Sequence, residues 1–262
     1  MRRVVVTGMG GVTALGEDWP TIRAALAAGK TAVRTMTPEW NRFTGIRTRL
    51  AAPVLGFDVS ERYPRKKLRS MGRVAQMSVY ATEKALADAG LTDDPILHSG
   101  RLGVAYGSSY GSPDAVLGIC ELKTTGTSRA MNATNYIRMM SHTAAVNISV
   151  FFGTAGRLIP TSCACASGSM AIGYAAETIR MNKADVMIAG GSEELDIADV
   201  ATFDTMFSTS TMNDAPGRSP RPFDRDRDGL VIGEGACTLI LEEYEHAKAR
   251  GAPVFAEIAG FA

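Results

Sequence analysis

Two cysteines lie two residues apart in the stretch 161-TSCACASG-168, after a short apolar run and before small residues. Cys165 is followed directly by Ala-Ser-Gly, which is typical of a helix start that packs deep in a protein. The unpaired N–H groups of a helix N-terminus stabilise a thiolate. They can also hold the oxyanion that forms when a thiolate attacks a carbonyl. We therefore interpret Cys165, rather than its neighbour Cys163, as a candidate nucleophile.

Other uses of this cysteine pair are weaker. A disulfide between positions i and i+2 is badly strained. A metal site needs further Cys or His at ligand spacing, and the nearby sequence offers none. Two buried structural cysteines remain an alternative, because cysteine is among the most commonly buried residues.

The composition indicates an ordinary globular protein with a sizeable core. Of 262 residues, 45% are hydrophobic and 21% are charged, with a net charge of +1, so nothing suggests nucleic acid or a membrane surface as a partner. No segment approaches the roughly 18 apolar residues of a membrane span, and the opening MRRVVVTG is not a signal peptide. Four cysteines without a regular framework favour a reducing compartment, and we expect a cytoplasmic protein.

Short apolar runs alternate with helical patterns along the chain, which predicts an α/β fold with helices layered on a mostly parallel sheet. The predicted strands are 4–7, 102–107, 157–162, 185–190, 238–242 and 254–261. The predicted helices are 71–89, 136–152, 166–182, 243–250 and one that follows Asp18 and stops at Gly29. The irregular stretches 30–65 and 204–228 are interpreted as excursions from this fold.

Two stretches resemble ligand-binding motifs, but each lacks a residue that its motif requires. We therefore expect neither a cofactor nor a metal. Gly8-Met9-Gly10 follows a strand, but Thr13 stands where a dinucleotide fingerprint needs its third glycine. The run 224–235 resembles a calcium loop but has Gly235 in place of the required glutamate. Arginines interrupt its carboxylates, so we predict a loop held by internal salt bridges.

Four blocks together resemble the β-ketoacyl-acyl-carrier-protein synthases, and the resemblance runs from residue 3 to the last residue. The blocks are TSCACASG, 186-VMIAGGSEE-194, 220-PRPFDRDRDGLVIGEG-235 and 238-TLILEEYEHAKARG-251. In that family the cysteine before a small residue, Ser and Gly is the acyl-accepting nucleophile, which corresponds to Cys165. The detailed residue sequence of these blocks is similar to that of the ketosynthases of aryl-polyene gene clusters.

The resemblance implies a thiolase fold, in which two similar halves form α-β-α-β-α layers. The family's two catalytic histidines belong to the second half, so residues 1–262 are expected to be the N-terminal domain, with the C-terminal half absent. The histidines of this chain do not match those two. We expect His98, His142 and His246 to be structural or exposed to solvent.

The resemblance also implies an activity and its partners. Cys165 would accept an acyl chain for decarboxylative Claisen condensation with malonyl-carrier protein, in fatty acid or polyketide synthesis. Tyr110 and Phe203 match acyl-pocket positions, with core packing as the alternative. Lys66 and Arg69 match positions that dock an acidic acyl carrier protein, with a solvated charged face as the alternative. The expected second partner is an identical or related synthase subunit, which gives a homodimer or a heterodimer.

Two other classes stay open. A chain-length factor is a non-catalytic relative that usually lacks the nucleophile, so the retained Cys165 argues against it. A thiolase shares the fold and a nucleophilic cysteine but uses coenzyme A. The basic cluster 65-RKKLR-69 and the PFDRDRDG block favour the synthase.

Overall fold

The computed structural model describes residues 2–261, which divide into two compact units. Unit 1 comprises residues 2–12, 58–193 and 236–261, and unit 2 comprises residues 13–57 and 194–235. The chain therefore leaves unit 1 twice. The irregular stretches 30–65 and 204–228 fall mostly in unit 2, as expected for excursions from the α/β unit.

Unit 1 is built on a six-stranded sheet in the order β5-β4-β6-β8-β1-β9. The strands are β1 (Val4–Thr13), β4 (Leu102–Gly107), β5 (Leu158–Thr161), β6 (Val186–Glu193), β8 (Gly235–Glu243) and β9 (Ala256–Glu257). β4 runs parallel to both β5 and β6, with Gly107 opposite Thr161 and Gly191. The carboxyl ends of these three strands therefore meet at one edge of the sheet.

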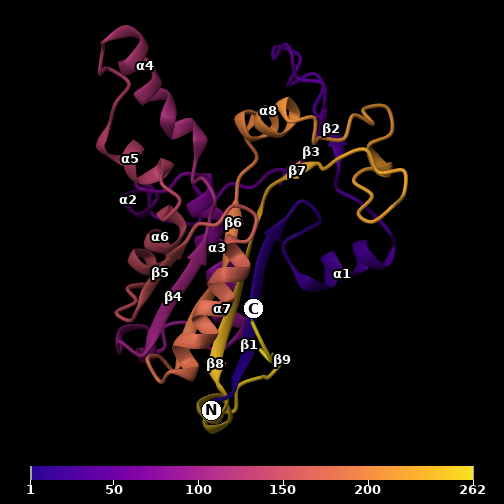
Figure 1. Ribbon diagram of the computed structural model, residues 1–262. Helices are drawn as coiled ribbons and strands as arrows, with labels where there is room; N and C mark the ends of the chain where they lie inside the picture. Colours follow the sequence, from indigo (N-terminus) through magenta and orange to yellow (C-terminus); the bar gives the residue numbers. More distant parts are fainter. Residues whose placement is uncertain (1, 262) are drawn as a thin grey trace. The chain divides into compact units, whose positions relative to one another are not determined.

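Helices cover both faces of this sheet. The helices of unit 1 are α2 (Arg65–Leu68), α3 (Arg73–Asp88), α4 (Leu117–Thr125), α5 (Ala133–Met139), α6 (Thr143–Phe152), α7 (Ser167–Arg180) and α9 (Tyr244–Ala249). α7 crosses one face (Figure 1) and shares a buried core with Ala105, Met187 and Ala189. α3 packs on the other face, where Ser78 Oγ lies 2.5 Å from Ser192 Oγ of β6. Unit 1 is thus a layered α-β-α arrangement.

Most predicted elements of unit 1 are confirmed, with two differences. The predicted helix 136–152 is two helices, α5 and α6, because Met140 takes an extended conformation between them. The predicted strand 254–261 shrinks to the two residues of β9, which pair antiparallel with Val5 and Val6 at the sheet edge. The helices α2 and α4 were not predicted.

Unit 2 has a small sheet and its own core. Its strands β2 (Arg34–Thr35), β3 (Leu50–Ala52) and β7 (Ile232–Gly233) lie in that order. Trp40, Ala51 and Val200 form the buried core, Val200 coming from α8 (Ile197–Thr205). Helix α1 (Trp19–Ala27) begins as predicted, with the Asp18 carboxylate accepting from Thr21 N at 2.8 Å. In the part of the chain described, no helix has the length and apolar character needed to cross a membrane.

A buried carboxylate ties the last helix of unit 1 to the sheet. Glu242 of β8 is fully buried and accepts from Arg250 Nε at 2.7 Å, His246 Nδ1 at 2.6 Å and Thr7 Oγ1 at 2.8 Å. Burial alone would raise the pKa of Glu242, but the bonds from Arg250, His246 and Thr7 outweigh it and lower the pKa. The folded state therefore holds this group as a carboxylate.

Replacement of this carboxylate should destabilise the protein measurably. Glu242→Gln is expected to lower the free energy of unfolding at neutral pH by about 3 kcal/mol, because the charge of Arg250 loses its buried partner. Since the pKa of Glu242 is lower in the folded state, its contribution is present above about pH 4.3 and is lost as pH falls. Urea unfolding at pH 7 and pH 3 checks this, with Glu257→Gln at an exposed ion pair as control. An equal deficit at both pH values would contradict the ionic origin.

Candidate active site

The two cysteines lie in a tight turn, the cysteine elbow (residues 162–167), between the end of β5 and the start of α7. Ala164 between them adopts a left-handed backbone conformation with φ of +45°, which costs a non-glycine residue about 1 kcal/mol. The Ser167 hydroxyl holds this turn closed, since it accepts from Cys163 N at 2.8 Å and donates to the Ala164 carbonyl at 2.7 Å. The strained elbow is therefore cross-linked by a single buried side chain.

The elbow is fixed against the ends of two neighbouring strands. A Cβ atom on Gly107, at the end of β4, would lie 2.5 Å from the backbone carbon of Ser167. A Cβ atom on Gly191 of β6 would lie 3.0 Å from Gly168 Cα. Only residues without a side chain allow such a close approach of strand and helix. The first turn of α7 thus packs deep against the sheet, as the run of small residues predicted.

Both elbow cysteines are exposed, so accessibility does not separate them. The hydrogen bonding of their backbone N–H groups does distinguish Cys163 from Cys165. The N–H of Cys163 is used in the bond to Ser167, whereas the N–H of Cys165 has no acceptor among residues 2–261. Cys165 also stands directly before Ala166, the N-cap of the fourteen-residue helix α7. It combines an accessible sulfur with a nearby unpaired donor, which is the arrangement that a nucleophilic thiolate requires.

At the carboxyl ends of β4 and β6, one carboxylate is hydrogen-bonded to two serines, a feature that the sequence analysis missed. Glu193, the last residue of β6, accepts from Ser108 Oγ at 2.5 Å and from Ser109 N at 2.7 Å. It also accepts from Ser109 Oγ. The signal for these bonds was present, because the block VMIAGGSEE places an acidic residue at the end of a buried strand.

The two predicted acyl-pocket residues lie in different units. Tyr110 is in unit 1, in the loop after β4, and its side chain is 46% exposed. Among residues 2–261, Tyr110 is therefore not a buried core residue. Phe203 is in unit 2 on α8 and is half-buried. A role of either residue in an acyl pocket stays a prediction.

The basic cluster lies on and beside the short helix α2. The side chains of Lys66 and Arg69 are exposed, and neither forms an ion pair with another described residue. Their neighbour Lys67 is instead held in place, since its Nζ donates to the Phe151 carbonyl at 2.8 Å and lies over the Phe151 ring. Arg138 donates to the Arg69 carbonyl at 2.7 Å, which fixes the backbone of the cluster.

Comparison with protein-family models identifies this chain. The model of the β-ketoacyl synthase N-terminal domain matches residues 1–247, which include the cysteine elbow and every candidate residue above. The chain belongs to the β-ketoacyl synthase family.

Relatives and solved structures of β-ketoacyl synthases agree with this assignment. The 3-oxoacyl-[acyl-carrier-protein] synthase 2 of Vibrio cholerae is 37% identical over 99% of this chain and 62% of its own length. The crystal structure of a β-ketoacyl synthase from Burkholderia phymatum is 57% identical, with a TM-score of 0.96 over 99% of this chain and 64% of that one. A type II polyketide ketosynthase, solved in complex with its acyl-carrier protein, is 30% identical, with a TM-score of 0.77 over 99% of this chain and 62% of that one.

These matches confirm the predicted thiolase-like α/β fold. They also show that the chain spans less than two-thirds of the length of the β-ketoacyl synthases that it matches. The alignments therefore concern the part of those proteins that corresponds to the residues described above.

The three histidines of this β-ketoacyl synthase chain have structural or exposed positions, as predicted. His98 Nδ1 lies 2.8 Å from the Gly153 carbonyl, and His246 is bonded to Glu242. His142 is exposed at the N-terminus of α6.

The predicted loop held by internal salt bridges is confirmed only in part, because one ion pair among the described residues lies within 224–235 and the segment ends in β7 and the start of β8. Arg225 pairs with Asp226 at 3.2 Å, and Arg221, just before the loop, lies 3.9 Å from Asp224. Within the described residues, no group of three or more His, Cys, Asp or Glu side chains is arranged to hold a metal.

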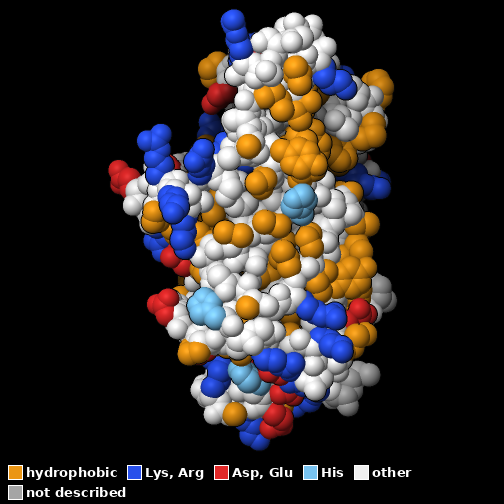
Figure 2. Space-filling view, turned by 90° about the vertical axis from the view of Figure 1, so that its left-hand side faces the viewer, with side chains coloured by type: hydrophobic (Ala, Val, Ile, Leu, Met, Phe, Trp, Pro, Cys, Tyr) orange, Lys and Arg blue, Asp and Glu red, His pale blue; other side chains and the backbone are white. Residues whose placement is uncertain are grey.

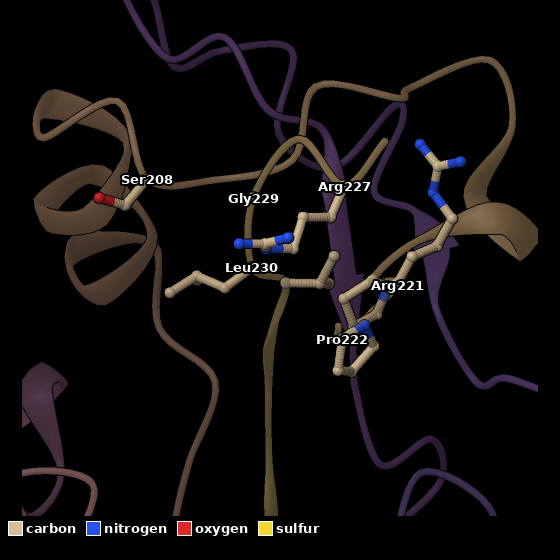
Figure 3. A pocket seen from close by; sticks show the side chains of 8 residues that line it. Ser208, Arg221, Pro222, Arg227, Gly229 and Leu230 are labelled. Carbon is tan, nitrogen blue, oxygen red and sulfur yellow. The ribbon is translucent and has the colours of Figure 1, made fainter. Parts of the chain in front are cut away.

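A hollow of about 530 Å³ lies beside this loop within unit 2. Its lining residues are Ser208, Pro220, Arg221, Pro222, Arg227, Gly229, Leu230 and Val231. In Figure 3 the guanidinium groups of Arg221 and Arg227 extend in different directions. The hollow therefore lacks the convergent charges of an anion site.

Proposed function

We propose that this chain is the nucleophile-bearing part of a 3-oxoacyl-[acyl-carrier-protein] synthase. The observation that carries the proposal is Cys165, an exposed sulfur beside an unpaired backbone N–H at the start of α7. In the first step the Cys165 thiolate attacks the carbonyl carbon of an acyl thioester. The new C–S bond forms as the carrier thiolate leaves, and the carrier thiolate takes up a proton from solvent. The oxyanion formed in between needs donors, and the Cys165 N–H is one.

The second step transfers this acyl group to a two-carbon unit. Malonyl-carrier protein loses carbon dioxide, and the electron pair of the broken C–C bond becomes an enolate. Its carbon attacks the acyl carbonyl on Cys165, the C–S bond breaks, and the thiolate is restored. The product is a 3-oxoacyl thioester on the carrier protein. The enolate oxygen requires positioned donors, and two of the three histidines here already use Nδ1 elsewhere, His246 with Glu242 and His98 with the Gly153 carbonyl.

The test of this function is direct. The complete protein is incubated with an acyl-carrier protein and malonyl-carrier protein, and the 3-oxoacyl product is sought by mass spectrometry. A product that forms equally well from free coenzyme A thioesters, without carrier protein, would favour a thiolase. Absence of covalent labelling by the acyl-mimicking epoxide cerulenin would favour a non-catalytic chain-length factor.

We further propose that Tyr110 and Phe203 line the acyl pocket or its approach. The exposure of Tyr110 next to the strand end that abuts the cysteine elbow supports this role for Tyr110.

The acyl chains could belong to fatty acid, polyketide or aryl-polyene synthesis. The resemblance of the GLVIGEG and SCACASG blocks supports the aryl-polyene type.

Docking of an acyl carrier protein is proposed at Lys66 and Arg69. Carrier proteins present acidic side chains, and exposed cationic side chains without internal partners steer such a surface and fix its register. The solved complex of a related ketosynthase with its acyl-carrier protein supports a partner of this class. The rigid backbone of the cluster, held by Arg138 and Lys67, favours a defined binding geometry.

Charge reversal at this cluster should weaken the complex. Lys66→Glu with Arg69→Glu is expected to reduce affinity for acyl carrier protein about tenfold at low salt, because exposed ion pairs are worth roughly 0.2–1 kcal/mol each. The loss should shrink at high salt, where screening removes these interactions. The matched control is Lys183→Glu with Lys248→Glu, which makes the same charge change at two other exposed lysines of unit 1. Equal weakening by both pairs would leave only a net-charge effect.

A second synthase subunit is proposed to cover the apolar face of unit 1. Figure 2 shows hydrophobic side chains gathered on the face that carries α4, α5, α6 and β5. Exposed hydrophobic side chains on these four elements include Leu117, Tyr136, Val150 and Leu158. β5 is the terminal strand of the sheet, so its outer edge offers backbone groups for pairing. A homodimer and a heterodimer both fit these features.

We also propose a cytoplasmic location, supported by four unpaired cysteines among the described residues.

A further inference from the structure

The carboxylate of Glu193 is engaged by one short loop rather than by a cation. No lysine, arginine or histidine pairs with it among the described residues. Its three donors come from Ser108 and Ser109, the first two residues after β4. Each carboxylate oxygen therefore accepts from a different residue of the same loop. A carboxylate is suited to this role because it offers acceptors only.

These bonds set the conformation of the loop that carries Tyr110. Ser108 is buried, and its Oγ accepts from Gly111 N at 3.1 Å while it donates to Glu193. The loop is closed on its far side by Ser112 N, which donates to the Arg138 carbonyl at 2.9 Å. Tyr110 thus lies between two anchored points. Its side chain is exposed, but its backbone is not free to move.

The anchored loop starts where the cysteine elbow is packed. Gly107 precedes Ser108 and touches Ser167, two residues from Cys165. Ser108 N also donates to the carbonyl of Thr161, the last residue of β5, at 3.3 Å. Displacement of the loop would therefore shift the surroundings of the cysteine without changing the cysteine itself.

We propose that Glu193 is a positioning residue, whose carboxylate holds loop 108–111 so that Tyr110 defines which acyl chains reach Cys165. The proposal rests on the proposed acyltransferase function. Glu193 does not touch the reacting atoms; it acts through Ser108, Ser109 and the backbone of Tyr110. Loss of the carboxylate would release the loop and widen or block the approach for long acyl chains.

The experiment compares Glu193→Ala with the wild type in the complete protein. Acylation of the cysteine is followed by intact mass spectrometry with a short (C2) and a long (C12) acyl-carrier thioester. Alkylation by iodoacetamide, with the adduct located by peptide mapping, reports the intrinsic accessibility of Cys165. Glu121→Ala on α4 is the matched control, because its carboxylate has no bonded partner among residues 2–261. Thermal unfolding reports folding of each variant.

Glu193→Ala is expected to change the ratio of long-chain to short-chain acylation rates by about ten- to a hundredfold, since small misplacements at a reacting centre have effects of that size. Iodoacetamide alkylation should stay within about twofold of wild type. Glu193→Gln, which retains one acceptor oxygen, should fall between wild type and Glu193→Ala. In a Tyr110→Ala background the effect of Glu193→Ala on the ratio should largely disappear, because both changes act on the same loop.

Other outcomes would overturn the proposal. A uniform loss of all three reactions would assign Glu193 to folding alone, and an unchanged ratio would show that the loop needs no carboxylate. Additive effects of Glu193→Ala and Tyr110→Ala would separate the two residues. If the wild type accepted neither thioester, the acyltransferase function itself would fail, and that result is distinct from a difference between variants.

Discussion

Cys165→Ser is expected to abolish covalent acylation, with a fall of at least about a thousandfold in rate. A hydroxyl at this position is a far weaker nucleophile than a thiolate, and no described group stands ready to deprotonate it. Treatment of the wild type with an acyl thioester should place the adduct on Cys165, as shown by peptide mass spectrometry. The structure gives the reason, since within residues 2–261 Cys165 alone combines an exposed sulfur with an unpaired N–H at the start of α7.

Cys163→Ser is the matched control for this substitution. It keeps the backbone bond from residue 163 to the Ser167 hydroxyl, since that bond uses the main-chain N–H. Acylation should therefore persist in Cys163→Ser within a few-fold of wild type. Modification of Cys163 with Cys165 untouched would reverse the assignment of the nucleophile.

The 262-residue polypeptide on its own is expected to form no 3-oxoacyl product. Decarboxylation leaves an enolate whose charge needs positioned donors in a site with little water. Loss of one such donor typically costs about 10²–10³ in rate, and loss of two should cost more. His246 Nδ1 is bonded to Glu242 and His98 Nδ1 lies against the Gly153 carbonyl, so both rings are engaged in structural contacts.

This second prediction is checked with both thioester substrates and product detection by mass spectrometry. Acylation of Cys165 can still occur in the polypeptide, because it requires only the elbow. Addition in trans of the C-terminal half found in longer β-ketoacyl synthases should restore condensation. Turnover by the 262 residues alone would place the acid–base groups within them and contradict our reading of the histidines.

Sequence reasoning succeeded where the signal was local. The spacing of apolar residues in 71–89 predicted α3, and the small residues after Cys165 predicted the packed start of α7. Gly90, with φ of +68°, ends its helix as its residue type indicates. In each case neighbouring residues along the chain determine the conformation.

The missed features depend on contacts between distant segments. The bond from Ser108 to Glu193 joins residues that are 85 positions apart, and only the parallel register of β4 and β6 brings them together. The short length of β9 is likewise determined by contacts with a distant segment. Its apolar sequence favours a longer strand, but its backbone bonds to β1 are found between Phe255 and Ile258, which donate to the Val6 and Val4 carbonyls on either side of the paired Ala256 and Glu257.

The contact between Gly107 and Ser167 limits where this site can vary. A side chain at Gly107 would have to displace the backbone of α7 and with it the strained turn that carries the sulfur. Laboratory redesign and natural divergence alike should therefore leave the strand end constant. New substrate preferences should arise in the loop that begins one residue later, where Tyr110 projects into solvent. A library randomised at 109 and 110 should thus yield many folded variants, whereas one randomised at 107 should yield almost none.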